Sequence, residues 1–126
     1  MTFPENIKYT KEHEWVRIEG NTGIVGITDY AQGELGDIVF VELPVKGKHV
    51  KQGETFGSIE AVKAVSDLFA PVSGEVIDVN PALQKTPEIV NREPYAGGWM
   101  VKIKITNQSE VSNLFDAKKY REFVGA

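Results

Sequence analysis

Two strand-like segments of similar length flank a single lysine, and this arrangement most constrains what the chain can form. Residues 56–62 precede Lys63 and residues 64–70 follow it, and both segments mix apolar with small side chains. Their matched lengths predict a β-hairpin with Lys63 at or beside the bend. No Gly or Pro lies within five residues of Lys63, so the bend lacks the Asn-Gly or Asp-Gly chemistry of tight hairpins. Most lysines are only solvated charges, so something other than turn propensity must favour Lys63 here.

The rest of the chain also favours short strands joined by turns. Residues 14–28 alternate on both sides of a Gly-rich segment and predict a second hairpin. Thr28 is a candidate N-cap for a short helix over residues 29–32 that ends at Gly33 or Gly36. Further strands are predicted at residues 7–9, 37–43, 75–79 and 99–105. We therefore expect one mainly β domain over residues 1–126, a sandwich or small barrel of short strands with C-terminal helices.

The predicted core is aromatic at Trp15, Phe40 and Trp99. Residues 80–94 contain three prolines, which predicts a loop with at most one helical turn. Near the C-terminus, Asp116 is a candidate cap for a helix whose buried face is Tyr120, Phe123 and Val124.

Composition excludes several classes of function. The net charge of -4 argues against nucleic acid as a partner, because phosphate binding requires clustered Lys and Arg. The chain has no Cys and two His, too few for a structural zinc site, and we expect no metal. No apolar run is long enough to cross a membrane, and the first residues resemble neither a signal nor a transit peptide. A cytoplasmic location is the simplest expectation, although a mature organellar form remains open.

No catalytic motif is present, because the chain lacks a nucleophile elbow, a phosphate loop and a dinucleotide fingerprint. A triad of Ser66, Asp67 and a histidine is defined by geometry that residue types alone do not supply. An exposed lysine is, however, a good attachment point for an acyl group delivered by a ligase. We therefore expect a carrier and not an enzyme.

Four blocks of the sequence resemble the glycine cleavage system H protein, a lipoyl carrier of glycine catabolism. The match covers nearly the whole chain, in order and at the family's spacing, with blocks at residues 9–16, 26–44, 58–76 and 91–100. The resemblance implies a barrel-sandwich hybrid fold with a projecting lysine hairpin. It also implies lipoate attached to Lys63 as an amide. The implied partners are a pyridoxal-phosphate glycine decarboxylase, a folate-dependent aminomethyltransferase, dihydrolipoamide dehydrogenase, and a lipoate ligase or lipoyl transferase.

Further site candidates follow from this resemblance. Glu60 and Asp67 flank Lys63 and are either recognition charges for the ligase or merely solvated. An aminomethyl group on sulfur is labile and carries an ammonium, so a cleft with a carboxylate would shelter it. Glu14 is the first candidate for that carboxylate, with Glu12 and Asp67 behind it, and the alternative is that Glu12 and Glu14 are exposed strand-edge residues.

Competing functions stay open at this point. One is a carrier that relays lipoyl groups to other proteins, and another is an unmodified interaction module. A biotin carrier is disfavoured, because Val62 and Ala64 stand where methionines are usual. Ala61 and Val65 depart from common family forms around the lysine, but both are small or modest apolar residues.

Overall fold

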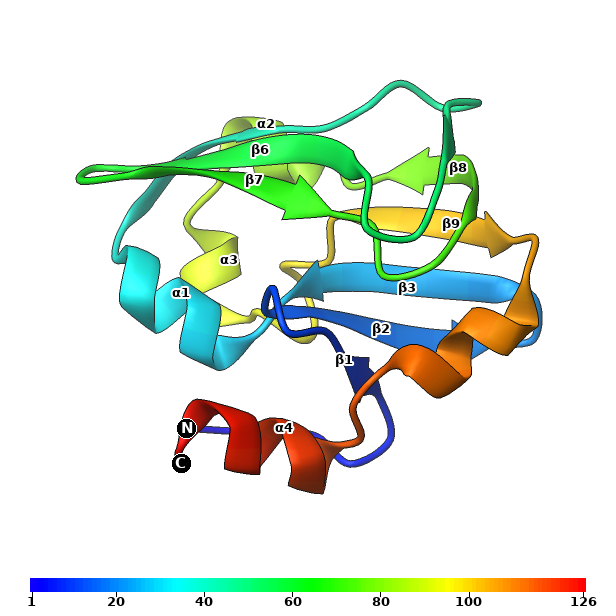
Figure 1. Cartoon of the computed structure of the whole chain (residues 1–126). Helices are drawn as coiled ribbons and strands as arrows, with labels where there is room; N and C mark the ends of the chain where they lie inside the picture. Colours follow the sequence, from blue (N-terminus) through cyan, green and yellow to red (C-terminus); the bar gives the residue numbers. More distant parts are fainter.

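Nine strands form two antiparallel sheets that pack face to face (Figure 1). The computed structural model describes all residues from Met1 to Ala126. The larger sheet has six strands in the order β1 (Lys8–Tyr9), β2 (Glu14–Glu19), β3 (Thr22–Ile27), β9 (Val101–Ile105), β8 (Gly74–Val79) and β5 (His49–Val50). The smaller sheet has three strands, in the order β4 (Ile38–Glu42), β6 (Thr55–Ala61) and β7 (Val65–Phe69). The predicted mainly β fold agrees with this arrangement.

The predicted hairpin over residues 14–28 is confirmed as β2 and β3, which pair from Glu14–Ile27 to Glu19–Thr22. The helix that follows, α1 (Asp29–Leu35), begins as predicted, because Thr28 Oγ1 accepts a hydrogen bond from the Ala31 amide. It ends at Gly36, whose φ of 81° suits a residue without a side chain. α1 therefore follows β3 directly, and it lies beside β6 and β7 of the smaller sheet.

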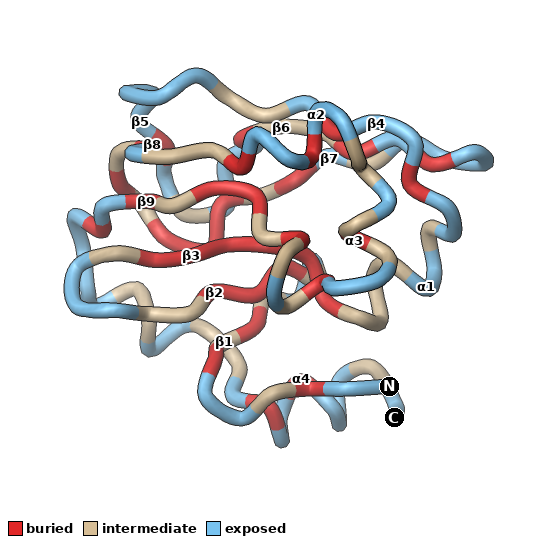
Figure 2. Tube along the Cα trace, turned by 180° about the vertical axis from the view of Figure 1, so that it is seen from behind, coloured by how far each residue is buried: buried red, intermediate tan, exposed pale blue.

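Buried side chains form two clusters, on opposite faces of the larger sheet. The main cluster of 19 residues fills the space between the two sheets. The second cluster of seven lies between the larger sheet and the C-terminal helix α4 (Ala117–Val124), where the Tyr9 and Tyr120 rings stack at 4.6 Å. Figure 2 shows the resulting run of buried backbone along β2, β3 and β9. Both faces of β2 are therefore covered, which buries Trp15 as predicted.

Two of the three aromatic core predictions need correction. Phe40 is 48% exposed, because it lies on the outer face of the smaller sheet, which no other element covers. Trp99 is only partly buried and lies before β9 begins, and Met100 is the fully buried residue there.

The proline-containing segment is more helical than predicted. It contains two one-turn helices, α2 (Ala82–Lys85) and α3 (Ile89–Arg92). Pro81 lies at the N-cap of α2, and Pro87 precedes the N-cap of α3. Proline is tolerated at a helix start because its missing N–H is not needed there.

The C-terminal segment starts with the 3-10 helix η1 (Gln108–Asn113) and continues into α4. Asp116 caps α4 as predicted, by accepting a hydrogen bond from the Lys119 amide at 2.8 Å. Tyr120 is buried as predicted, but Phe123 is 51% exposed and Ala117 is the second buried residue of the helix. No helix in the structure combines the length and the apolarity needed to cross a bilayer.

Candidate functional site

The predicted lysine hairpin is confirmed as β6 and β7, which pair from Thr55–Phe69 to Glu60–Val65. The tip is a two-residue bend over Val62 and Lys63, in which the Ala61 amide donates to the Ala64 carbonyl at 2.7 Å. Neither bend residue has a positive φ, so the bend requires no glycine. Lys63 is exposed at this tip, which projects at the left of Figure 1.

The root of the hairpin is fixed in the main core. Ile59, Ala61 and Leu68 are buried there, with at most 5% of their surfaces exposed. At the base of the bend, the Val62 amide donates to the Asp37 carbonyl at 3.1 Å and ties the tip to the segment before β4. Lys63 therefore lies at the tip of a hairpin whose strands are packed into the main core.

A cleft of about 230 Å³, which we call the seam cleft, opens between β7 and the larger sheet. Its walls come from the end of the β1–β2 loop, from β3 and α1, and from the hairpin. The lining residues are Glu12, His13, Glu14, Ile27, Tyr30, Ala31, Glu34, Leu35, Ile59, Ser66, Asp67 and Leu68. The cleft combines apolar walls with four acidic residues, three of which, Glu12, Glu14 and Asp67, are candidates from the sequence.

Glu14 is the buried carboxyl of this cleft, with only 2% of its surface exposed. Its Oε1 accepts a hydrogen bond from Thr10 Oγ1 at 2.8 Å, and its Oε2 accepts one from the Phe69 amide at 3.2 Å. Neither of the two ion pairs in the structure includes Glu14. Burial therefore raises the pKa of Glu14 to about 8, against the lowering effect of its hydrogen bonds. The expectation of an exposed strand-edge position is wrong for Glu14.

Glu12 lines the same cleft but is exposed, as a strand-edge residue would be. Between the two acids, His13 has a φ of 74°, in the left-handed region that residues other than glycine rarely adopt. His13 Nδ1 lies 2.9 Å from the Tyr120 hydroxyl, which in turn lies 2.8 Å from Thr28 Oγ1. Burial lowers the pKa of His13. Nothing in the sequence pattern had indicated this link between the cleft and α4.

A second, larger hollow of about 420 Å³ lies on the other side of Glu14, and we call it the basal cavity. It shares Glu12 and Glu14 with the seam cleft but reaches the far end of the hairpin at Phe69 and Pro71 and the C-terminal segment at Phe115. The Glu14 carboxyl therefore lies between two hollows. No group of three or more potential ligand side chains is arranged to hold a metal ion.

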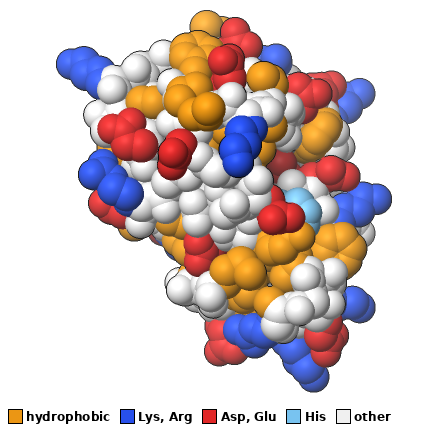
Figure 3. Space-filling model, turned by 90° about the vertical axis from the view of Figure 1, so that its left-hand side faces the viewer, with side chains coloured by type: hydrophobic (Ala, Val, Ile, Leu, Met, Phe, Trp, Pro, Cys, Tyr) orange, Lys and Arg blue, Asp and Glu red, His pale blue; other side chains and the backbone are white.

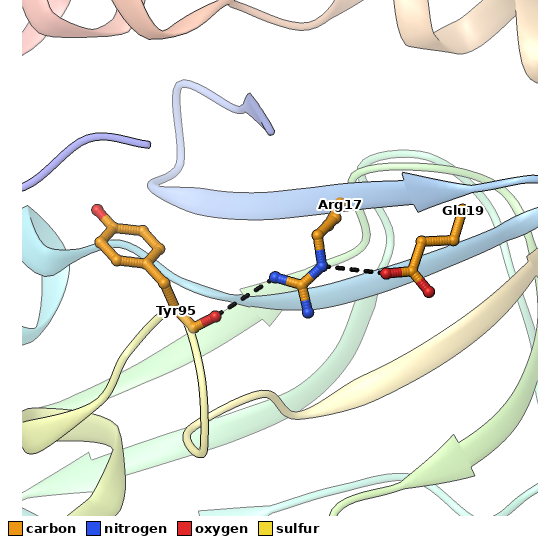
Figure 4. Close-up of polar contacts among 3 residues, drawn as sticks. All are labelled: Arg17, Glu19 and Tyr95. Atoms are coloured by element: carbon orange, nitrogen blue, oxygen red, sulfur yellow. Dashed lines mark hydrogen bonds and ion pairs between the residues drawn. The ribbon is translucent and has the colours of Figure 1, made fainter. Parts of the chain in front are cut away.

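The start of α1, which forms one wall of the seam cleft, is held by Tyr95, which in turn contacts the larger sheet. The Arg17 guanidinium donates to the Tyr95 carbonyl at 3.4 Å and pairs with Glu19 at 3.3 Å (Figure 4). The Tyr95 hydroxyl accepts a hydrogen bond from the Asp29 amide, at 2.9 Å, and so holds the first residue of α1. Burial raises the pKa of Tyr95 to about 12, which keeps this hydroxyl protonated.

The remaining predicted residues, Glu60 and Asp67, are exposed on the outer face of the hairpin, but Asp67 lies on the edge strand β7 and so also borders the seam cleft. Figure 3 views the molecule from the side to which the tip projects, and hydrophobic and acidic side chains gather in the upper part of that face. The structure thus brings Glu12, Glu14 and Asp67 together around the cleft and leaves Glu60 outside it.

Known proteins resemble this chain along its whole length. A family model described as glycine cleavage H-protein matches residues 7–126. The glycine cleavage system H protein of Bacteroides fragilis is 56% identical over 126 residues, which cover 100% of both chains. That of Staphylococcus carnosus is 54% identical over 125 residues, covering 99% of each.

A solved structure shows the same fold. The crystal structure of a glycine cleavage system H protein from Mycobacterium marinum matches with a TM-score of 0.90 and 39% identity, over 98% of this chain and 99% of that one. The predicted barrel-sandwich hybrid is confirmed by this likeness, with two sheets that do not close into a barrel. The chain therefore belongs to the glycine cleavage H-protein family.

Proposed function

We propose that Lys63 carries a lipoyl group in amide linkage and that the chain acts as a carrier and not as a catalyst. The exposure of Lys63 at the tip of a hairpin rooted in the core is the observation that carries the proposal. During attachment, the uncharged Nζ attacks the carbonyl carbon of an activated lipoyl group, such as an acyl adenylate. The amide C–N bond forms, the bond from that carbon to its leaving group breaks, and Nζ releases a proton. The lysine loses its charge in this step.

The partners follow from membership in the glycine cleavage system. When bound, the lipoyl group would supply a disulfide that can accept the aminomethyl group of glycine on one sulfur and a proton on the other, as the carboxyl group of glycine leaves as CO2. A pyridoxal-phosphate glycine decarboxylase, a folate-dependent aminomethyltransferase and dihydrolipoamide dehydrogenase would act on it in turn. The task of the chain itself is to present the lysine and to provide a surface that protects the cargo.

The seam cleft fits the length of such an arm. An extended lipoyl-lysine spans about 15 Å from Cα to the ring, at roughly 1.25 Å per bond, and about 20 Å to an ammonium beyond it. At about 3.3 Å per strand residue, Asp67 lies about 13 Å along β7 from Lys63 and Phe69 about 20 Å. The arm can therefore reach Glu14, which binds the Phe69 amide, but not the far wall of the basal cavity.

Glu14 is the proposed acceptor for the ammonium of the cargo. Its carboxyl is buried, lacks a cationic partner and lines the seam cleft. An incoming cation would favour the ionised carboxylate and form a charge-assisted hydrogen bond with it. Glu12 and Asp67 lie exposed around the same cleft and would add to its negative potential.

Mass mapping tests the attachment. After incubation with a lipoate ligase, lipoate and ATP, the wild type should gain one lipoyl group, on the peptide that contains Lys63. Lys63→Arg should gain none, while Lys48→Arg, at another exposed lysine, serves as the matched control. Lipoylation that persists in Lys63→Arg would contradict the assignment.

Ammonia release tests the protection of the cargo. Folded, aminomethyl-loaded carrier should lose ammonia more slowly than the same protein after heat unfolding, because the cleft excludes water. Glu14→Gln should be lipoylated normally but should release ammonia faster when folded, and Glu12→Gln should behave more like the wild type. Equal rates from folded and unfolded wild type would rule out protection, and an unchanged rate in Glu14→Gln would remove only the role of Glu14.

A further inference from the structure

Half of the large hydrophobic side chains that the structure exposes lie at one end of the smaller sheet. Val62 and Val65 are 71% and 69% exposed, on either side of Lys63, and Val39 and Phe40 on β4 are each 48% exposed. We call these four residues the tip patch. Exposed apolar side chains gathered at one end of a sheet mark an interaction site more often than scattered ones do.

The strand register shows why these residues lie together. Phe40 on β4 is opposite Glu60 on β6, and Glu60 is opposite Val65 on β7. The register shift between Ile38 and Phe40 leaves Val39 exposed as well. Phe40, Glu60 and Val65 thus form one row across the outer face of the sheet, next to the bend that carries Lys63.

The surroundings of the tip patch are acidic. The next row across the same face is Glu42, Ser58 and Asp67, with Ser58 Oγ donating to Glu42 Oε1 at 3.4 Å. Asp37 is exposed below the bend, and Lys63 is the one basic residue on the three strands and the bend between them. A partner that matches this surface has an apolar platform bordered by basic side chains.

We infer that the tip patch is the docking surface for the enzyme that attaches the lipoyl group, and that Phe40 is its main contact from outside the hairpin. This inference rests on the proposed function and deepens it. The attaching enzyme must bring Lys63 Nζ itself to its acyl donor, so it closes over the bend and the row behind it. Partners that act on the finished arm reach its sulfurs about 15 Å away and do not need to cover the bend.

Kinetics of lipoylation with a lipoate ligase, lipoate and ATP test the inference. Val65→Thr removes apolar surface without changing the shape of the side chain, and Phe40→Thr removes the ring. Each should lower kcat/KM for the carrier by about threefold to tenfold, as expected for the loss of one buried methyl group or of a partly buried ring. The rate for the wild type should also fall as salt is added, because the surface is acidic.

Val45→Thr provides the matched control. Val45 is 77% exposed and follows the end of β4 that lies away from the bend. The Val45→Thr protein should therefore be lipoylated at the wild-type rate. The fully lipoylated Val65→Thr and Phe40→Thr proteins should then exchange the aminomethyl group with the decarboxylase at the wild-type rate.

The outcomes of these experiments distinguish a failure of the proposed function from a failure of the docking surface. Wild-type protein that is never modified at Lys63 would overturn the proposed function itself. Normal modification of the wild type, Val65→Thr and Phe40→Thr with equal kcat/KM would overturn only the docking surface. Equal slowing of lipoylation and of aminomethyl exchange would show a surface shared by all partners and would overturn its assignment to the attaching enzyme.

Discussion

Replacing Glu14 with Gln should change how the stability of the protein depends on pH. Burial raises the pKa of Glu14 from 4.5 to about 8, so the folded protein keeps a proton that the unfolded chain has lost. This contribution to stability is fully present below pH 4.5, falls as the pH rises, and is gone above pH 8 or so. Gln does not titrate, so the variant lacks this dependence.

The size of the effect follows from the difference between the two pKa values. Each pH unit inside the window corresponds to about 1.4 kcal/mol, so the wild type should lose up to about 4 kcal/mol between pH 5 and 8 relative to Glu14→Gln. The hydrogen bonds of Glu14 are compatible with Gln, because its Oε1 can accept from the Phe69 amide while its Nε2 donates to Thr10 Oγ1. The variant should therefore fold normally and be the more stable protein at pH 8.

Urea unfolding at pH 5.5, 7.0 and 8.5 measures this difference. The two unfolding free energies should be similar at pH 5.5 and should diverge in favour of Glu14→Gln at higher pH. Glu12→Gln, at an exposed carboxylate, is the control and should follow the wild type. Parallel profiles for the wild type and Glu14→Gln would refute the view that Glu14 is uncharged in the folded protein at neutral pH.

Two further substitutions test the packing within the larger sheet and beside the seam cleft. Gly74→Ala should lower the free energy of unfolding in urea by about 3 kcal/mol or more, because a Cβ there would overlap the Lys104 carbonyl oxygen across the β8–β9 ladder. Gly33→Ala, on an open face of α1, is the control and should be neutral or stabilising. A small loss of stability in Gly74→Ala would contradict this close approach. Tyr120→Phe should cost about 1 to 2 kcal/mol, because it removes the hydroxyl that bridges His13 and Thr28, and a loss below about 0.3 kcal/mol would show that this bridge does not stabilise the protein.

The sequence was sufficient for those parts in which local pattern and burial agree. The alternation of β2 and β3, the Thr28 cap and the matched flanks of Lys63 all predict what the structure contains. The same alternation places Glu14 on the face of β2 that also carries Val16 and Ile18. That pattern indicates a buried side chain at position 14. Glutamate is usually exposed, however, and the residue type therefore favours the opposite prediction.

Other features depend on contacts between distant segments and could not be predicted locally. The sequence predicts a core position for Phe40 because large aromatic side chains are usually buried, yet its face of the sheet has no covering element. The seam cleft arises only where β7, β2 and α1 meet. The link from His13 to Tyr120 joins residues more than a hundred positions apart, and short-range patterns contain no information about it.

β4 and β7 are the edge strands of the smaller sheet, and side chains form hydrogen bonds with their outer backbone groups, where further strands would otherwise pair. On the β4 side, Asn91 Oδ1 accepts a hydrogen bond from the Ile38 amide and Gln84 Nε2 donates to the Val41 carbonyl. On the β7 side, Glu14 Oε2 accepts one from the Phe69 amide. At least one backbone group that could pair with a foreign β-strand is thereby occupied at each of the two margins. With fewer backbone groups free at these edges, recognition of the smaller sheet by another protein would use its outer face and the tip of the hairpin.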